Sequence, residues 1–122
     1  MSTVDLQEST FTQTLEDNDI VFVDFWAEWC GPCRSFAPVY DKISEEFPGV
    51  VFAKVDTGAE QALAQGFQIT SIPTLMAIRD KVVLFSQAGA LPEPALRDLV
   101  TKVQAVDMDD VRTQIAAQNQ GG

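Results

Sequence analysis

Histidine is absent from the 122 residues of this chain, and only two cysteines are present. Without histidine the chain cannot form a Ser-His-Asp or Cys-His catalytic site, a histidine-containing zinc site or a c-type haem attachment. Zinc and iron-sulfur sites normally need four soft ligands, so two cysteines could bind a metal only between two chains. The sequence also has no GxGxxG or P-loop pattern, and no phosphate-binding loop is therefore indicated.

Long apolar runs are missing as well. None approaches the roughly 20 residues that a membrane-spanning helix needs. The first ten residues are polar and acidic, without the basic start and apolar stretch of a secretory signal, so we expect the protein in the cytoplasm. Thiols are kept reduced in that compartment, where a lone cysteine pair is more often catalytic or metal-binding than structural.

Basic residues are few. Eight lysines and arginines stand against 18 aspartates and glutamates, which gives a net charge of −10. Such a surface repels phosphate backbones and anionic lipids, so we expect neither nucleic acid nor a membrane as a partner. The length and an apolar fraction of 46% are ordinary for one globular domain.

Two apolar runs rich in β-branched and aromatic residues predict buried strands at Ile20–Trp26 and Val50–Val55. The segment between them starts near Pro32 and has apolar residues at helical spacing, which predicts an amphipathic helix. Together these elements form a right-handed βαβ unit. Pro38 lies inside the helix and should kink it.

The second half of the chain predicts an antiparallel hairpin followed by a helix. The hairpin strands are Thr74–Ile78 and Val82–Ala88, and the helix is Ala95–Val106. Shorter helices are expected at Ser9–Glu16 and Ala59–Gln65. The predicted fold class is α/β, with a mixed sheet wrapped by helices.

The sequence changes character from Asp107 onward. Met108, Val111 and Ile115 are spaced to line a short extra helix, and the polar segment Gln118–Gly122 is expected to fray. We therefore divide the chain into a main domain, residues 1–106, and a C-terminal extension, residues 107–122.

The candidate site is Cys30-Gly31-Pro32-Cys33, at the junction between the first long strand and the helix after it. A thiol at a helix N-terminus meets unpaired N–H groups and the positive end of the helix dipole, and both favour the thiolate. Cys30 can face solvent there and is the predicted nucleophile, whereas Cys33, one turn later, should be shielded and resolve the intermediate. Pro32 gives a rigid first turn, and Gly31 permits close approach. The plainer alternatives are half of a zinc site or a static disulfide.

Asp24 is a carboxylate in the middle of an apolar strand. Burial of its charge is costly, so its pKa should rise toward neutrality, and such an acid can exchange a proton with Cys33. Lys54 lies on the neighbouring predicted strand and could modulate that charge. From the residues alone, a structural ion pair between Asp24 and Lys54 is an equally good interpretation.

The run Val23-Asp24-Phe25-Trp26-Ala27-Glu28-Trp29-Cys30-Gly31-Pro32-Cys33-Arg34 is followed by Pro38, Lys54, Ile72-Pro73-Thr74 and Gly89. This pattern resembles the thioredoxin family from about Leu6 to Val106. The resemblance implies a thioredoxin fold: one domain with a central five-stranded mixed sheet, about four flanking helices and a cis peptide bond before Pro73. It favours the proton-transfer role for Asp24.

The resemblance also implies the activity of a protein-disulfide reductase that cycles the Cys30–Cys33 disulfide and binds no separate cofactor. The backbone at Ile72 would pair with an extended stretch of the client protein, beside an apolar contact surface. That surface would comprise Trp29, Gly31, Pro32, Ile72, Pro73, Gly89 and Ala90. Without the resemblance, Ile72 and Gly89 would be assigned to ordinary packing and a turn. The implied partners are disulfide-containing clients and a flavin- and NADPH-dependent thioredoxin reductase, and we expect a monomer.

Three features depart from the common family pattern. Arg34 replaces a frequent lysine and keeps the charge, Asp80-Lys81 replaces a glycine-containing hairpin turn, and the segment after Val106 is additional.

Alternative functions on the same fold are a disulfide oxidase or isomerase, and a binding module whose redox chemistry is incidental. Metal binding between two chains is a further alternative.

Overall fold

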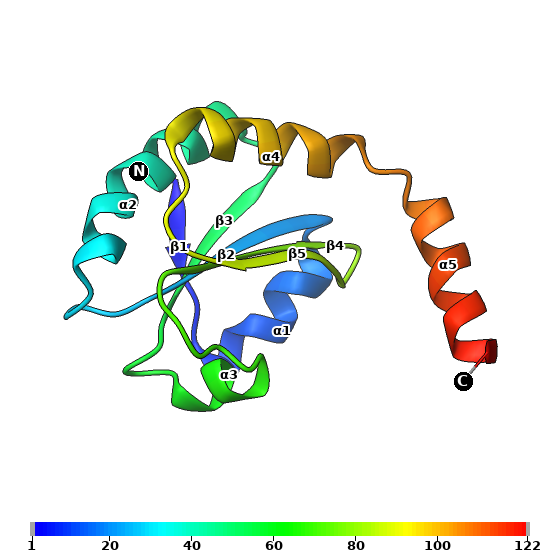
Figure 1. The fold of residues 1–122 in the computed structure, drawn as a ribbon, viewed down its shortest axis with the longest axis horizontal. Helices are drawn as coiled ribbons and strands as arrows, with labels where there is room; N and C mark the ends of the chain where they lie inside the picture. Colours follow the sequence, from blue (N-terminus) through cyan, green and yellow to red (C-terminus); the bar gives the residue numbers. More distant parts are fainter. Residues whose placement is uncertain (1, 122) are drawn as a thin grey trace.

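The structure is a computed structural model that describes residues 2–121, and the side chains of 2–118. Within these residues, five strands and five helices follow one another (Figure 1). The order is β1 (Thr3–Asp5), α1 (Glu8–Asp17), β2 (Ile20–Trp26), α2 (Gly31–Glu46), β3 (Val51–Asp56), α3 (Gln61–Gly66), β4 (Thr74–Arg79), β5 (Val82–Ala88), α4 (Glu93–Ala105) and α5 (Met108–Gly121). The predicted α/β class and five-stranded mixed sheet are therefore confirmed.

The sheet has the strand order β1-β3-β2-β4-β5. β2 is its central strand and pairs in parallel with β3 and antiparallel with β4. The β2–α2–β3 segment is the predicted βαβ unit, and β4 and β5 form the predicted antiparallel hairpin. Because β2 is covered on both faces, nearly all its residues are apolar instead of alternating with polar ones.

Two hydrophobic clusters lie on opposite faces of the sheet. On one face, α2 and α4 pack against residues such as Phe22, Phe52 and Leu75. On the other, α1 and α3 cover Val21, Val23 and their neighbours, and Figure 1 shows these two helices below the sheet. The period of two along β2 sends Phe22 and Asp24 to the α2 face and Val23 to the other.

Several element boundaries differ from the sequence predictions. β1 was not predicted from the residues, because three residues of which two are exposed give no apolar run. α4 begins two residues earlier than predicted, since Pro94 fits into a first helical turn, where its missing N–H is not needed. Pro38 does lie within α2, and the kink predicted there stays a prediction.

The chain continues past α4 into α5, a helix longer than the short one predicted (Figure 1). Its backbone is helical through Gly121. The fraying expected from Gln118 stays a prediction. Gly122 lies outside the described residues. No helix within residues 2–121 combines the length and apolar character needed to cross a bilayer.

Candidate functional site

Cys30 is the N-cap residue of α2, directly after the turn that follows β2. It forms a disulfide with Cys33, and their Cα atoms lie 5.3 Å apart. The backbone N–H of Cys33 donates a hydrogen bond to Sγ of Cys30 at 3.2 Å. Pro32 stands in the first turn and leaves one fewer N–H to satisfy. The positive end of the helix is thus directed at the first sulfur, the arrangement that favours a thiolate once the disulfide is reduced.

The exposure predicted for Cys30 is wrong for this disulfide form. Cys30 is 8% exposed and Cys33 is 3% exposed, so both are buried and Cys30 only slightly less. The cover comes from Ile72, whose carbonyl oxygen lies 3.7 Å from Sγ of Cys30, and from Ala27 and Trp26.

The Ile72–Pro73 peptide bond is cis, as predicted. The carbonyl of Pro73 accepts a hydrogen bond from the N–H of Gly89 at 2.8 Å, and Gly89 has a φ of 105° that suits only glycine. These contacts bring together the cysteine turn, the cis-proline turn and the end of β5, three segments that are distant in sequence.

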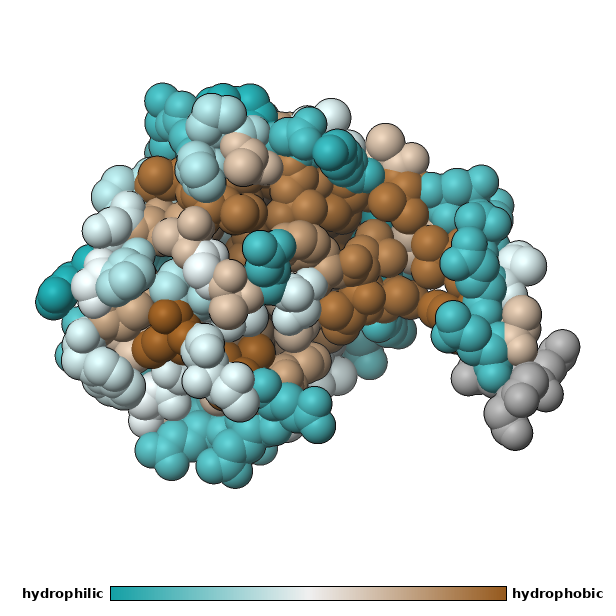
Figure 2. Space-filling model, viewed as in Figure 1, coloured by the Kyte–Doolittle hydropathy of each residue, from teal (hydrophilic) through white to brown (hydrophobic). Residues whose placement is uncertain are grey.

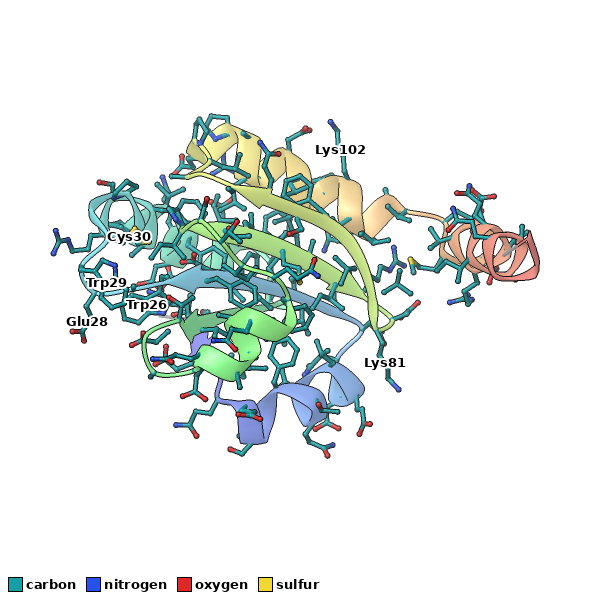
Figure 3. All side chains as sticks on the ribbon, turned by 60° about the horizontal axis from the view of Figure 1, so that its bottom comes forward. Trp26, Glu28, Trp29, Cys30, Lys81 and Lys102 are labelled. Carbon is teal, nitrogen blue, oxygen red and sulfur yellow. A yellow bond between two sulfur atoms is a disulfide. The ribbon has the colours of Figure 1, made fainter. Side chains whose placement is uncertain are left out.

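The predicted contact surface is only partly continuous in the structure. Trp29 is 71% exposed and lies with the cysteine loop at one end of the molecule in Figure 3. Gly31, Pro32, Gly89 and Ala90 are exposed too, Ile72 is half-buried and Pro73 is buried. Pro73 can therefore shape the surface but offers little area to a partner.

Asp24 is completely buried, between Lys54 of β3 and Leu75 of β4 in the sheet register. Neither of its carboxylate oxygens has a hydrogen-bond partner in the described part of the chain. Burial raises its pKa from an ordinary 3.8 to about 7, and the charge of Lys54 opposes that rise. The charge of Asp24 also contributes to the raised pKa of Tyr40 on α2. Because side chains alternate along β2, Asp24 lies on the same face as Phe22, which α2 covers.

The ammonium group of Lys54 lies over the indole ring of Trp26, 4.9 Å from the ring centre. It makes a cation–π contact there instead of the direct ion pair with Asp24 that the sequence left open. The indole nitrogen of Trp26 is also buried without a partner in the described structure. Unpaired buried polar atoms of this kind are costly to stability.

Sequence reasoning missed the turn between β3 and α3. Oδ1 of Asp56 accepts hydrogen bonds from the N–H groups of Gly58 at 2.9 Å and Ala59 at 3.3 Å. The Trp29 ring lies against Gly58 and forms a wall of a cavity of about 320 Å³. The only available signal was a possible Asx turn in Asp56-Thr57-Gly58, which says nothing about a contact with Trp29.

Metal binding within one chain gains no support from the geometry. In the part of the chain that the structure describes, no three histidine, cysteine, aspartate or glutamate side chains are grouped so that they could hold an ion.

Comparison with known proteins finds relatives that are named as thioredoxins. A model of the thioredoxin family matches residues 2–102. A Streptomyces coelicolor protein assigned by name as thioredoxin 2 is 55% identical over 117 residues, covering 96% of this chain and 87% of that protein. The thioredoxin of Haemophilus influenzae is 37% identical over 99 residues, 80% of this chain and 92% of its own.

Solved structures give the same result. A thioredoxin of Plasmodium falciparum superposes with a TM-score of 0.76 at 33% identity, covering 82% of this chain and 97% of the other. A mutant thioredoxin of Halobacterium salinarum gives 0.78 at 31% identity, with coverages of 87% and 95%. The residues matched by the family model, 2–102, include all five strands and α2, which carries the cysteine pair.

Proposed function

The chain belongs to the thioredoxin family, and we propose that it reduces protein disulfides with Cys30 as the nucleophile and Cys33 as the resolving thiol. Its activity class is that of a thiol-disulfide oxidoreductase, with Cys30–Cys33 as the redox pair. The observation that carries the division of roles is the hydrogen bond from the Cys33 N–H to Sγ of Cys30 at the start of α2. It stabilises negative charge on sulfur 30 and not on sulfur 33.

In the reaction, the Cys30 thiolate attacks one sulfur of a client disulfide. The client S–S bond breaks, a mixed disulfide forms, and the released client sulfur takes up a proton. Cys33 then loses its proton and attacks Sγ of Cys30, which breaks the mixed disulfide. The client leaves with two reduced sulfurs, and the protein is left with the Cys30–Cys33 disulfide, so two electrons have passed to the client.

Asp24 is the proposed acceptor of the Cys33 proton. It is buried on the sheet face that α2 covers, and burial raises its pKa to about 7. A group that titrates near neutrality can both take and return a proton under ordinary conditions. Lys54 lowers that pKa by its charge, so its proposed role is to tune Asp24.

Clients are proposed to bind through the backbone at Ile72 and the surface around Trp29. The carbonyl of Ile72 lies beside Sγ of Cys30, so an extended client segment paired with it would present its disulfide to that sulfur. Gly31, Pro32, Gly89 and Ala90 would add exposed contact area, and the buried Pro73 would hold the shape of the turn.

The cellular setting is proposed from the family. We propose a monomer in the cytoplasm that is returned to the dithiol by an NADPH-linked thioredoxin reductase and that binds no cofactor of its own. Its clients are disulfide-containing proteins.

The assignment of roles is tested with Cys33→Ser. Without the resolving thiol, the Cys30 mixed disulfide should accumulate as covalent client complexes that dithiothreitol releases, visible on non-reducing gels. Cys30→Ser is the matched control and should trap nothing. If Cys30→Ser traps clients and Cys33→Ser does not, the two roles are reversed. If neither variant forms adducts and the native chain does not reduce a protein disulfide in an NADPH-coupled assay, the proposed function fails.

A further inference from the structure

Trp29 is the most exposed large apolar side chain of the site, yet its ring lies against one defined position, Gly58. A Cβ atom added at Gly58 would lie 3.1 Å from both Cη2 and Cζ3 of Trp29 and 3.3 Å from Oδ1 of Asp56. Contacts this short force the neighbours to move. We propose that Gly58 is a positioning residue: its lack of a side chain sets the place of the Trp29 ring and thereby the affinity for client proteins.

The backbone beneath the ring is held firmly. Besides the two bonds to Asp56, the N–H of Thr57 donates to the carbonyl of Trp26 at 2.8 Å, and that of Glu60 donates to the carbonyl of Asp56 at 2.8 Å. When a side chain is added at Gly58, the exposed Trp29 ring is therefore the part that yields. The backbone of Gly58 is not in the left-handed region, so a substitution tests the contact and not the turn conformation.

Movement of the ring would also reshape the space beside it. Trp29 forms one wall of the cavity of about 320 Å³, and the other walls come from α3 and its flanking turns. No charged side chain lines that cavity; its lining is Trp29, Thr57, Gly58, Gln61, Ala64, Gln65 and Ile69. Displacement of the ring therefore changes both the exposed face of the indole and the shape of this cavity, which together form the surface offered to a client.

This inference rests on the proposed role of Trp29 in client binding, and the experiment separates the two. Steady-state reduction of a disulfide protein is measured for Gly58→Ala and Gly58→Val in the NADPH-coupled assay. Because valine displaces the ring further than alanine, KM should rise about twofold for alanine and about tenfold for valine, with kcat changing less than about twofold. Reduction of hydroxyethyl disulfide, which is too small to need the Trp29 surface, should change less than about twofold.

Gly49 provides the matched control, because a Cβ there would meet nothing within 4 Å. Gly49→Ala and Gly49→Val should leave KM at the native value.

NMR gives a second readout of the position of the ring. The chain has two tryptophans, so its spectrum holds two indole N–H signals, and the Trp29→Ala variant shows which of them belongs to Trp29. In both Gly58 variants the Trp29 signal should shift, and the Trp26 signal should not. If Gly58→Val does not fold, the alanine variant decides by both readouts.

The double variant Gly58→Val with Trp29→Ala supplies the decisive comparison. With the ring gone, the valine should add no further rise in KM. An unchanged KM in the Gly58 variants, or an equal rise with and without Trp29, overturns the inference while the client-binding role of Trp29 stands. If Trp29→Ala leaves KM unchanged, that role fails, and the inference fails with it.

Discussion

The carboxyl group of Asp24 is fully buried, and burial places its pKa near 7 against 3.8 for an ordinary aspartate. Between these two values the folded chain keeps a proton that the unfolded chain has lost. Stability therefore falls as the pH rises through this window, and above pH 7 the folded state holds a buried anion. Three pKa units correspond to roughly 4 kcal/mol, a large share of the stability of a small domain.

Asp24→Asn should therefore stabilise the protein, and more at high pH than at low pH. Since the amide also lacks a hydrogen-bond partner, we expect a gain of roughly 2 to 3 kcal/mol at pH 8 and little change near pH 4. Urea unfolding at both pH values measures the difference. The same variant should slow the resolution of the mixed disulfide, because the proton acceptor for Cys33 is missing.

The exposed Asp19 gives the control for Asp24, since its replacement by asparagine should change stability by less than about 0.5 kcal/mol at either pH. An Asp24→Asn variant with native stability at pH 8 would show that the buried carboxylate is better solvated than its position indicates.

The burial of a single residue could be predicted from the sequence where its neighbours along the chain determine it. Asp24 stands within an apolar strand, so its burial could be predicted from Phe22, Val23 and Phe25 beside it. The cover over Cys30 could not, because it comes from Ile72, 42 positions later in the chain. The contact between Trp29 and Gly58 was missed for the same reason.

The hairpin turn between β4 and β5 consists of Asp80 and Lys81, both with positive φ, at 51° and 67°. A two-residue turn with this backbone strongly prefers glycine at its second position, where a lysine Cβ is unfavourable. Lys81→Gly should therefore stabilise the fold by about 0.5 to 1 kcal/mol, read as a rise in the urea midpoint. Lys81→Ala removes the charge but keeps the Cβ, and it should give no comparable rise. Equal gains in both variants would assign the effect to charge instead of backbone.

α5 contacts the rest of the molecule mainly through its first turns. Met108 is buried, and Arg112 forms an exposed ion pair with Asp80 at 3.3 Å. We propose that residues 107–122 are an extension that catalysis does not require. A chain ending at Asp107 should keep native kcat and KM and lose roughly 1 to 2 kcal/mol of stability, the value of one buried methionine. A rise in KM after truncation would instead place α5 in client binding.

Element prediction was accurate where a hydrophobic pattern is strong. The first long strand, Ile20–Trp26, was predicted with its observed bounds, because both of its faces are buried and its run is continuous. β1 has only three residues and exists through pairing with β3, a partner almost fifty positions away. α5 is longer than predicted because Ala116, Ala117 and Gln118 have high helix propensity without adding to an apolar stripe.

Charge is distributed unevenly over the whole molecule. No lysine or arginine occurs before Arg34, and the α1 side of the sheet carries Glu8, Glu16, Asp17 and Asp19. Figure 2 shows a hydrophilic lower edge where Figure 1 places α1 and α3. On the opposite face, acidic and basic groups pair between α2 and α4, at Lys42–Glu93 (2.9 Å) and Arg97–Glu46 (2.8 Å). The α1 layer therefore contributes negative charge without any basic residue of its own, and Glu28 adds a carboxylate at the cysteine loop (Figure 3).

A field of this sign should favour basic clients by raising their association rate. For a basic disulfide protein, kcat/KM should fall about tenfold as ionic strength rises from about 0.01 to 0.15 M, because screening removes the attraction. For an acidic client it should rise, and for hydroxyethyl disulfide it should stay constant. Glu28→Gln, beside Trp29, should weaken the salt dependence with the basic client, whereas Asp110→Asn on α5 should not. Equal salt dependence for basic and acidic clients would contradict this prediction. It would mean that contacts at the cysteine loop, and not the charge of the whole molecule, determine the association rate with clients.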